Sequence, residues 1–170
     1  MPIFLVGFMG CGKSTVARGL AKFSGWEFVD LDARVCELAG AESVAEIFEK
    51  SGEEEFRRLE RQAVDMLSPT SRTIVATGGG APCYGDNMER FMALGTTVYL
   101  KMSPLALRDR LLRVRVVRPK IVGMSPEELL DYVTTLLAER EKFYSRARVI
   151  IDCDDVPSGS VVARLRYLTR

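Results

Sequence analysis

The sequence predicts an α/β protein of three layers, α/β/α, in which a central sheet of five parallel strands lies between two layers of helices. Short β-branched or aromatic runs alternate with longer helical patterns along the 170 residues, which is typical of repeated β-α-β units. A glycine-rich loop follows the first run directly and leads into an amphipathic helix. With 47% hydrophobic residues, the composition is ordinary for one globular domain, and we expect a single domain over residues 1–170.

The five expected strands are short and well separated. They lie at 3–6, 26–29, 73–77, 96–100 and 148–152. The first, third and fifth of these runs are almost continuously apolar, which favours strands that are buried on both faces of the sheet. Helical patterns fill the intervals between them and follow the last one.

Two features mark helix boundaries in these intervals. Residues 45–67 read as two helices separated at Ser51-Gly52, since glycine interrupts a helix. A later helix is announced by Ser125 at its N-cap, with Pro126 in the first turn and Glu128 closing a capping box. We expect the inward stripe of that helix to consist of Leu129, Val133 and Leu136, with Arg140 on the same stripe. An arginine there either extends to solvent or reaches a buried anion.

Composition and charge exclude several classes of protein. The net charge of +1 gives no global electrostatic reason to bind nucleic acid or an anionic membrane. The apolar stretch at residues 2–6 is too short for a signal peptide or a membrane span. The four cysteines are far apart and form no C-x-x-C pair, which indicates neither a zinc site nor a disulfide framework. We therefore expect a cytoplasmic protein.

The sequence contains no histidine, so any chemistry must use carboxylates, lysine, arginine and backbone amides. The strongest motif for such chemistry is the stretch GFMGCGKS at residues 7–14, a full match to G-x-x-x-x-G-K-[ST]. Glycines allow the backbone amides of this loop to turn toward phosphate oxygens, and the following helix adds a favourable dipole. The motif predicts a P-loop NTPase fold, against the alternative of a simple glycine turn.

Each residue of the loop has an expected task. The residues expected to hold the phosphates of ATP are Gly10, Cys11, Gly12, Lys13, Ser14 and Thr15. Lys13 would reach the β- and γ-phosphates, and Ser14 would offer its hydroxyl to Mg²⁺. We interpret Cys11 as a small residue at a variable position rather than as a nucleophile.

Two carboxylates follow the second expected strand. Asp30 and Asp32 are two residues apart, so in an extended chain their side chains point the same way, at the strand end where open α/β sheets bind ligands. One would serve Mg²⁺ through water and the other a substrate hydroxyl. The alternative is that they cap the helix that follows. After the third strand, Gly78, Gly79 and Gly80 permit a close approach of backbone to ligand, although a tight turn would also explain them.

Basic residues are concentrated in the stretch from 108 to 120, which contains Arg108, Arg110, Arg113, Arg115, Arg118 and Lys120. A mobile lid at about 112–124 that carries such charge would close over a triphosphate, and a solvated basic surface is the alternative. Glu53 with Arg57 and Glu54 with Arg58 are i,i+4 pairs that suit an exposed helix. Composition does not distinguish Arg57 from its neighbours.

Taken in order, these motifs resemble the shikimate kinases, small P-loop kinases of the nucleoside monophosphate kinase-like group. The resemblance covers the whole chain, from the phosphate loop through FVDLD, EEFRRLE, ATGGG and RP to EREKFY. It implies Mg²⁺-ATP-dependent phosphorylation of the 3-hydroxyl of shikimate, giving shikimate 3-phosphate and ADP, in the biosynthesis of chorismate and aromatic amino acids. By the same analogy the protein acts as a monomer on small-molecule substrates.

The resemblance also implies roles for individual residues. Shikimate would be bound by Asp32, Arg57, Gly78, Gly79, Gly80 and Arg140, with a substrate-binding helical region at about 32–61. The catalytic residues would be Lys13, Asp32 and Arg118, where Asp32 holds the attacking hydroxyl and Arg118 is the lid arginine that reaches the ATP phosphates. Arg110 and Pro157 would flank adenine, and Ser14 and Asp30 would serve the metal.

The chain departs from the family pattern in the lid. The family usually continues the lid arginine as Arg-Pro-Leu, whereas this chain has Arg118-Pro119-Lys120, which predicts altered lid packing with the chemistry retained. Arg115 is the alternative lid arginine. Two other functions remain open on the sequence, namely a gluconate-type small-molecule kinase and a nucleotide-binding regulator without catalysis.

Overall fold

The computed structural model describes residues 1–113 and 119–170 of the chain. The described residues contain one parallel sheet whose strand order is β2-β3-β1-β4-β5. The strands are β1 (Ile3–Val6), β2 (Glu27–Asp30), β3 (Thr73–Ala76), β4 (Thr96–Lys101) and β5 (Val149–Asp152). Their ends agree with the sequence prediction to within one residue, and the predicted α/β/α fold class is confirmed.

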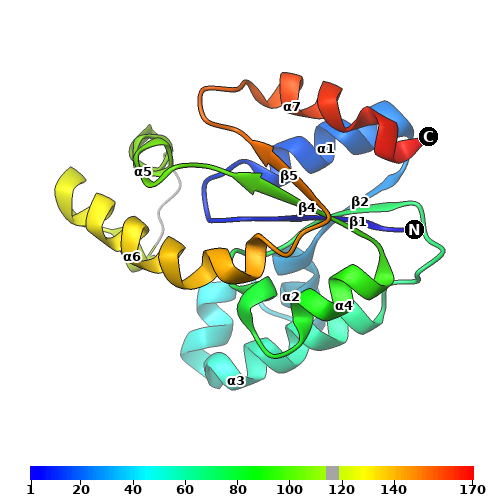
Figure 1. Ribbon diagram of the computed structural model, residues 1–170. Coiled ribbons are helices and arrows are strands. Elements are labelled where there is room, and N and C mark those ends of the chain that lie inside the picture. Colours follow the sequence, from blue (N-terminus) through cyan, green and yellow to red (C-terminus); the bar gives the residue numbers. More distant parts are fainter. Residues whose placement is uncertain (114–118) are drawn as a thin grey trace.

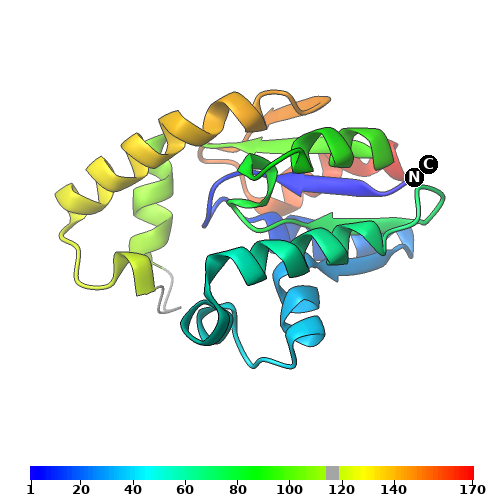
Figure 2. The same ribbon diagram turned by 90° about the horizontal axis from the view of Figure 1, so that it is seen from below.

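Helices cover both faces of this sheet. They are α1 (Lys13–Ser24), α2 (Leu31–Ala39), α3 (Val44–Asp65), α4 (Asn87–Leu94), α5 (Pro104–Arg113), α6 (Pro126–Tyr144) and α7 (Ser158–Leu165), with 3₁₀ turns at Ala81–Cys83, Pro119–Ile121 and Arg166–Thr169. Helices α1 and α7 lie on one face, while α3, α4 and α6 lie on the other (Figures 1 and 2). Among the described helices, none is both long enough and apolar enough to cross a bilayer.

Burial follows the position of each strand in the sheet. The inner strands β1 and β3 are buried along their whole length, as predicted. The prediction of burial on both faces was wrong for 148–152, because β5 is an edge strand in which exposed residues alternate with half-buried ones. Ile150 of this strand is 49% exposed.

The predicted helix boundaries are present. Gly52 interrupts α3 with φ 80° and ψ 174°, a left-handed φ that favours glycine, so residues 44–65 form two helical pieces. Ser125 caps α6, and the capping box with Glu128 is complete. The buried stripe of α6 differs in one position from the prediction, because Leu137 is buried while Leu136 is only half-buried.

The strand order places two loops side by side. Because β1 and β3 are parallel neighbours, the loop after β1 and the glycine loop after β3 both leave the sheet at the carboxyl ends of the strands. A β-carbon added to Gly79 would lie only 3.3 Å from the backbone nitrogen of Met9. Helix α5 and the beginning of α6 lie beyond these carboxyl ends (Figure 2). Open α/β sheets bind their ligands outside the carboxyl ends of the strands, at the point where the order of successive strands reverses. The predicted residues of the phosphate loop and of the glycine loop lie there.

Candidate active site

The phosphate loop bends back on itself between β1 and α1. Three of its glycines have positive φ, namely Gly7 at 143°, Gly10 at 83° and Gly12 at 96°. Lys13 folds into this bend and is only 8% exposed. Its ammonium group donates hydrogen bonds to the carbonyls of Gly7 at 2.8 Å and Phe8 at 2.9 Å. The loop therefore holds one positive charge beside the N-terminus of α1, where an anion is favoured.

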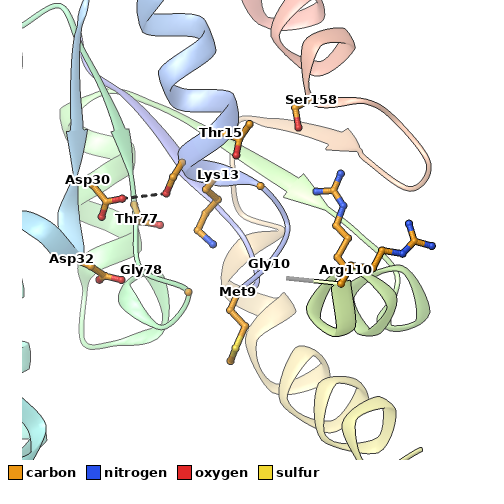
Figure 3. A pocket seen from close by; sticks show the side chains of 14 residues that line it. Met9, Gly10, Lys13, Thr15, Asp30, Asp32, Thr77, Gly78, Arg110 and Ser158 are labelled. Atoms are coloured by element: carbon orange, nitrogen blue, oxygen red, sulfur yellow. Dashed lines mark hydrogen bonds between the residues drawn. The ribbon is translucent and has the colours of Figure 1, made fainter. Parts of the chain in front are cut away.

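Asp30 links the phosphate loop to β2. Its Oδ2 accepts a hydrogen bond from the Ser14 hydroxyl at 3.1 Å (Figure 3). Its Oδ1 accepts from the Ala33 amide at 3.4 Å and so caps α2. The predicted helix cap is thus present, and the same acid also contacts Ser14 of the phosphate loop. The hydroxyl and carboxylate oxygens are hard donors of the kind that Mg²⁺ prefers, so these residues fit the ion.

The two-residue spacing had predicted that Asp30 and Asp32 both lie in extended chain. This prediction was wrong for Asp32. Strand β2 ends at Asp30 and α2 begins at Leu31, so Asp32 lies in the first helical turn. It nevertheless reaches the same cavity as Asp30. A β-carbon on Gly78 would lie 2.6 Å from Oδ1 of Asp32, so a side chain at position 78 would displace this carboxylate.

These side chains surround a cavity of about 490 Å³. Figure 3 shows Asp30 and Asp32 on one side of the phosphate loop and Arg110 on the other. The lining residues are Met9, Gly10, Gly12, Lys13, Ser14, Thr15, Asp30, Asp32, Thr77, Gly78, Gly79, Arg110, Arg113 and Ser158.

Sequence reasoning did not assign three of the lining residues to the site, namely Met9, Thr77 and Ser158. Thr77 carried a usable signal, since it is the last polar residue before the glycines. Its hydroxyl donates to the carbonyl of Leu5 at 3.0 Å and so ties β3 to β1 at the edge of the cavity.

Two arginines from distant helices meet at the glycine loop. A β-carbon on Gly80 would lie 2.9 Å from Nη2 of Arg57 and 3.5 Å from Nη2 of Arg140. Arg57 comes from α3 and Arg140 from α6, and both are half-buried. Two guanidinium groups beside Gly80 can bind a planar carboxylate by paired N–H donors. Neither arginine lines the cavity itself, but Nη1 of Arg140 would lie 3.4 Å from a β-carbon on Gly79, which does. Arg140 thus turns toward the site rather than toward solvent.

Arg57 is held by a buried acid that sequence reasoning missed. Its Nη1 lies 2.9 Å from Oε2 of Glu60, which is 1% exposed, and its Nη2 lies 3.4 Å from the predicted partner Glu53. Asn87 donates to the same Glu60 oxygen at 3.4 Å and to the carbonyl of Ala81 at 3.0 Å. Burial raises the pKa of Glu60, and the charge of Arg57 opposes that rise. The i,i+3 spacing of Arg57 and Glu60 was the feature of the sequence that could have predicted this ion pair.

Arg58, the neighbour of Arg57, faces outward. Both ends of its guanidinium group donate to Glu55 at 2.7 Å, so the predicted pair with Glu54 is replaced by a pair with Glu55. The side chain of Arg58 is 61% exposed and that of Arg57 only 13%. The tertiary structure thus distinguishes two arginines that the sequence left equivalent.

A second cavity of about 230 Å³ adjoins the first, with Arg110 and Arg113 lining both. Its remaining lining residues are Met102, Ala106, Asp109, Asp155, Val156 and Pro157. The structure therefore brings together Arg110 and Pro157, the residues expected to flank adenine. Nη1 of Arg110 also donates to the carbonyl of Cys11 at 3.2 Å, which fixes the guanidinium group against the phosphate loop.

The lid predictions are described only in part. Arg118 and its alternative Arg115 lie outside the described residues. Lys120 is described, and its ammonium nitrogen lies 5.8 Å from the ring centroid of Phe48 on α3. The Phe48 ring in turn lies 4.9 Å from that of Phe56, and the guanidinium carbon of Arg57 lies 5.2 Å from the Phe56 centroid. Lys120 thus contacts the ring of Phe48, whose neighbour Phe56 is in turn in contact with Arg57.

Known proteins resemble this chain along nearly its whole length. A family model described as shikimate kinase matches residues 9–167. A shikimate kinase of Parabacteroides distasonis is 42% identical over 160 residues, which cover 94% of this chain and 92% of that protein. The crystal structure of a shikimate kinase from Bacteroides thetaiotaomicron is 36% identical, with a TM-score of 0.91 over 99% of this chain and 97% of that one. A shikimate kinase from Acinetobacter baumannii, solved in complex with shikimate, is 33% identical, with a TM-score of 0.83 over 96% and 89%.

Proposed function

The chain belongs to the shikimate kinase family, and we propose that it transfers the γ-phosphoryl group of ATP to the 3-hydroxyl of shikimate. The products are ADP and shikimate 3-phosphate. The observation that carries this proposal is the meeting of Arg57 and Arg140 at Gly80, on the same glycine loop whose Gly78 lies against Asp32. An acceptor with one carboxylate and several hydroxyls suits that arrangement. The Acinetobacter relative, which was solved in complex with shikimate, supports the same acceptor.

In this proposal the protein works by position and charge, because phosphoryl transfer needs little covalent help. Arg57 and Arg140 bind the shikimate carboxylate and so orient the ring. Asp32 accepts a hydrogen bond from the 3-hydroxyl and takes its proton as the new P–O bond forms and the bond from phosphorus to ADP breaks. Lys13 and the lid arginine Arg118 would offset charge on the phosphates. Mg²⁺, held through Ser14 and Asp30, would offset negative charge on the phosphates.

The proposal includes an adenine site formed by Arg110 and Pro157. It also includes a monomer as the working unit. The single chain supplies residues from both sides of the nucleotide and acceptor sites, which supports a functional monomer. We further propose that it works in the cytoplasm, where the four free cysteines of the structure would stay reduced. The two cavities, of about 490 and 230 Å³, are of a size that suits small-molecule substrates.

A gluconate-type kinase would share the phosphate loop but has no need for two arginines facing a carboxylate beside Asp32. A regulator without catalysis would bind ATP and release no ADP. The test is ADP release from Mg²⁺-ATP with shikimate, quinate, gluconate or no acceptor. We expect shikimate-dependent release that disappears in Asp32→Asn, and ATP binding without release for any acceptor would overturn the proposal.

A pair of neighbouring arginines makes the same experiment sharper. Arg57→Ala should raise the KM for shikimate by at least about tenfold, since a charge-assisted hydrogen bond contributes about 1.5–3 kcal/mol. Arg58→Ala, one residue away on the same helix, removes an exposed pair with Glu55 and should leave the KM within about twofold. Equal effects of the two substitutions would argue against carboxylate binding by Arg57.

A further inference from the structure

We propose that Tyr144 is a positioning residue of the acceptor site, because its hydroxyl fixes the peptide between Gly79 and Gly80. This inference rests on the proposed function. Tyr144 is the last residue of α6, and no part of it is exposed. Its hydroxyl donates a hydrogen bond of 2.5 Å to the carbonyl of Gly79, 65 residues away in the chain.

The glycine loop needs such an external partner. Three successive glycines carry no side chains and have the greatest backbone freedom of any residue type. The carbonyl of Gly78 accepts from the Ala81 amide at 3.2 Å, and that of Gly80 accepts from the Cys83 amide at 3.0 Å. Both bonds are local turns. The carbonyl of Gly79 lies between them and is held by the tyrosine instead, so Tyr144 provides the long-range anchor of the loop.

The direction of this carbonyl determines the direction of an amide. A peptide unit is planar, and in the trans form its C=O and N–H point in opposite directions. Fixing the Gly79 carbonyl on Tyr144 therefore turns the Gly80 N–H away from the tyrosine. Gly80 is the residue at which Arg57 and Arg140 meet. An oriented amide beside two guanidinium groups gives a carboxylate a third donor.

The surroundings of Tyr144 keep its hydroxyl a donor. Burial raises the pKa of the phenol well above its ordinary value, although the neighbouring Arg140 acts in the opposite direction. The phenol thus remains protonated over the working pH range. Its ring is fixed by packing against the ring of Tyr99, with centroids 5.2 Å apart.

Tyr99 provides a matched control. It is 1% exposed, and its hydroxyl donates to Oε1 of Glu141 at 3.4 Å, away from the glycine loop. Tyr144→Phe and Tyr99→Phe each remove one hydroxyl from the same pair of tilted rings and keep both rings. Tyr99→Phe therefore measures the effect of removing a hydroxyl from this ring pair without removing the bond to Gly79.

The experiment measures steady-state kinetics, shikimate binding by calorimetry, and thermal midpoints for the wild type and both variants. Tyr144→Phe should raise the KM and Kd for shikimate on the order of tenfold, as expected for one hydrogen bond, with the KM for ATP within twofold of the wild type. Tyr99→Phe should change neither KM by more than twofold. Equal shikimate constants for the two variants would overturn the inference.

A wild-type measurement needs no variant. The carbonyl ¹³C resonance of Gly79 should lie downfield of the Gly78 and Gly80 carbonyls, because it accepts the shortest of the three bonds, and an undisplaced resonance would overturn the inference. Failure of the proposed function is distinguishable, since the wild type would then show no shikimate-dependent ADP release. An active wild type with an unaffected Tyr144→Phe variant rejects only the role of Tyr144.

Discussion

The hydroxyl of Ser14 lies 3.1 Å from Oδ2 of Asp30, which joins the first turn of α1 to the end of β2 across the sheet. The same carboxylate caps α2 through its other oxygen. One acid thus stabilises a helix and presents an oxygen beside the phosphate loop. The two tasks can be separated by substitution, because asparagine is as good an N-cap as aspartate but carries no charge.

Asp30→Asn should keep the fold and weaken the use of the metal. We expect the Mg²⁺ concentration for half-maximal activity to rise by about tenfold, since one full charge near the ion is lost, with a thermal midpoint within about 2 °C of the wild type. Magnesium titrations of the ADP-release rate, together with thermal melts, check both expectations. An unchanged magnesium requirement would show that Asp30 is only a helix cap.

Glu60→Gln should change the pH dependence of stability. Burial raises the pKa of Glu60 in the folded chain, so the folded state binds a proton there more readily than the unfolded state does. The wild type then loses stability as the pH rises through the raised pKa, because the buried carboxyl group must become charged. The neutral variant lacks this loss, and its free energy of unfolding relative to the wild type should increase with pH across that window.

Urea unfolding at a series of pH values measures this difference. Glu55→Gln is the control, because hydrogen bonding to Arg58 lowers the pKa of Glu55 and any pH effect there has the opposite sign. The same Glu60→Gln variant should have a higher KM for shikimate, since a neutral amide holds Arg57 less firmly than a carboxylate does. A stability difference that is independent of pH would contradict the prediction for Glu60.

Lys120→Gln should weaken shikimate binding modestly. An exposed cation–π contact contributes about 0.5–1 kcal/mol, so we expect a two- to fivefold increase in the KM for shikimate through the contact with Phe48. Lys120→Arg retains a cation and should behave like the wild type. If glutamine and arginine have the same effect in steady-state kinetics, the contact with the ring is without consequence for the substrate.

Arg118→Ala tests the lid prediction directly. If Arg118 contacts the γ-phosphate, its loss should lower kcat by about 10³ or more, the range of arginine fingers. Arg115→Ala is the matched variant in the same segment and should cost less than tenfold. Rapid-quench measurement of a single turnover separates the chemical step from product release. A loss below tenfold for Arg118→Ala, with a large loss for Arg115→Ala, would transfer the role to Arg115.

Much of the fold could be predicted from the sequence because the signals are local. The phosphate loop, the break of α3 at Gly52 and the capping box at Ser125 and Glu128 each depend on residues within one or two turns of chain. Strand positions followed from runs of apolar residues for the same reason. The burial of β5 was predicted wrongly because a strand's place at the edge of a sheet depends on its neighbours and not on its own residues.

The sequence by itself determined that a phosphate loop follows a buried strand, since spacing along the chain specifies that loop. The resemblance to a known family then predicted that Arg57 and Arg140 bind the substrate. Only the tertiary structure placed both at Gly80 and gave Arg57 a buried partner in Glu60. It alone joined Tyr144 to Gly79. Contacts between residues far apart in the chain depend on how helices pack across a sheet, and no local pattern encodes that packing.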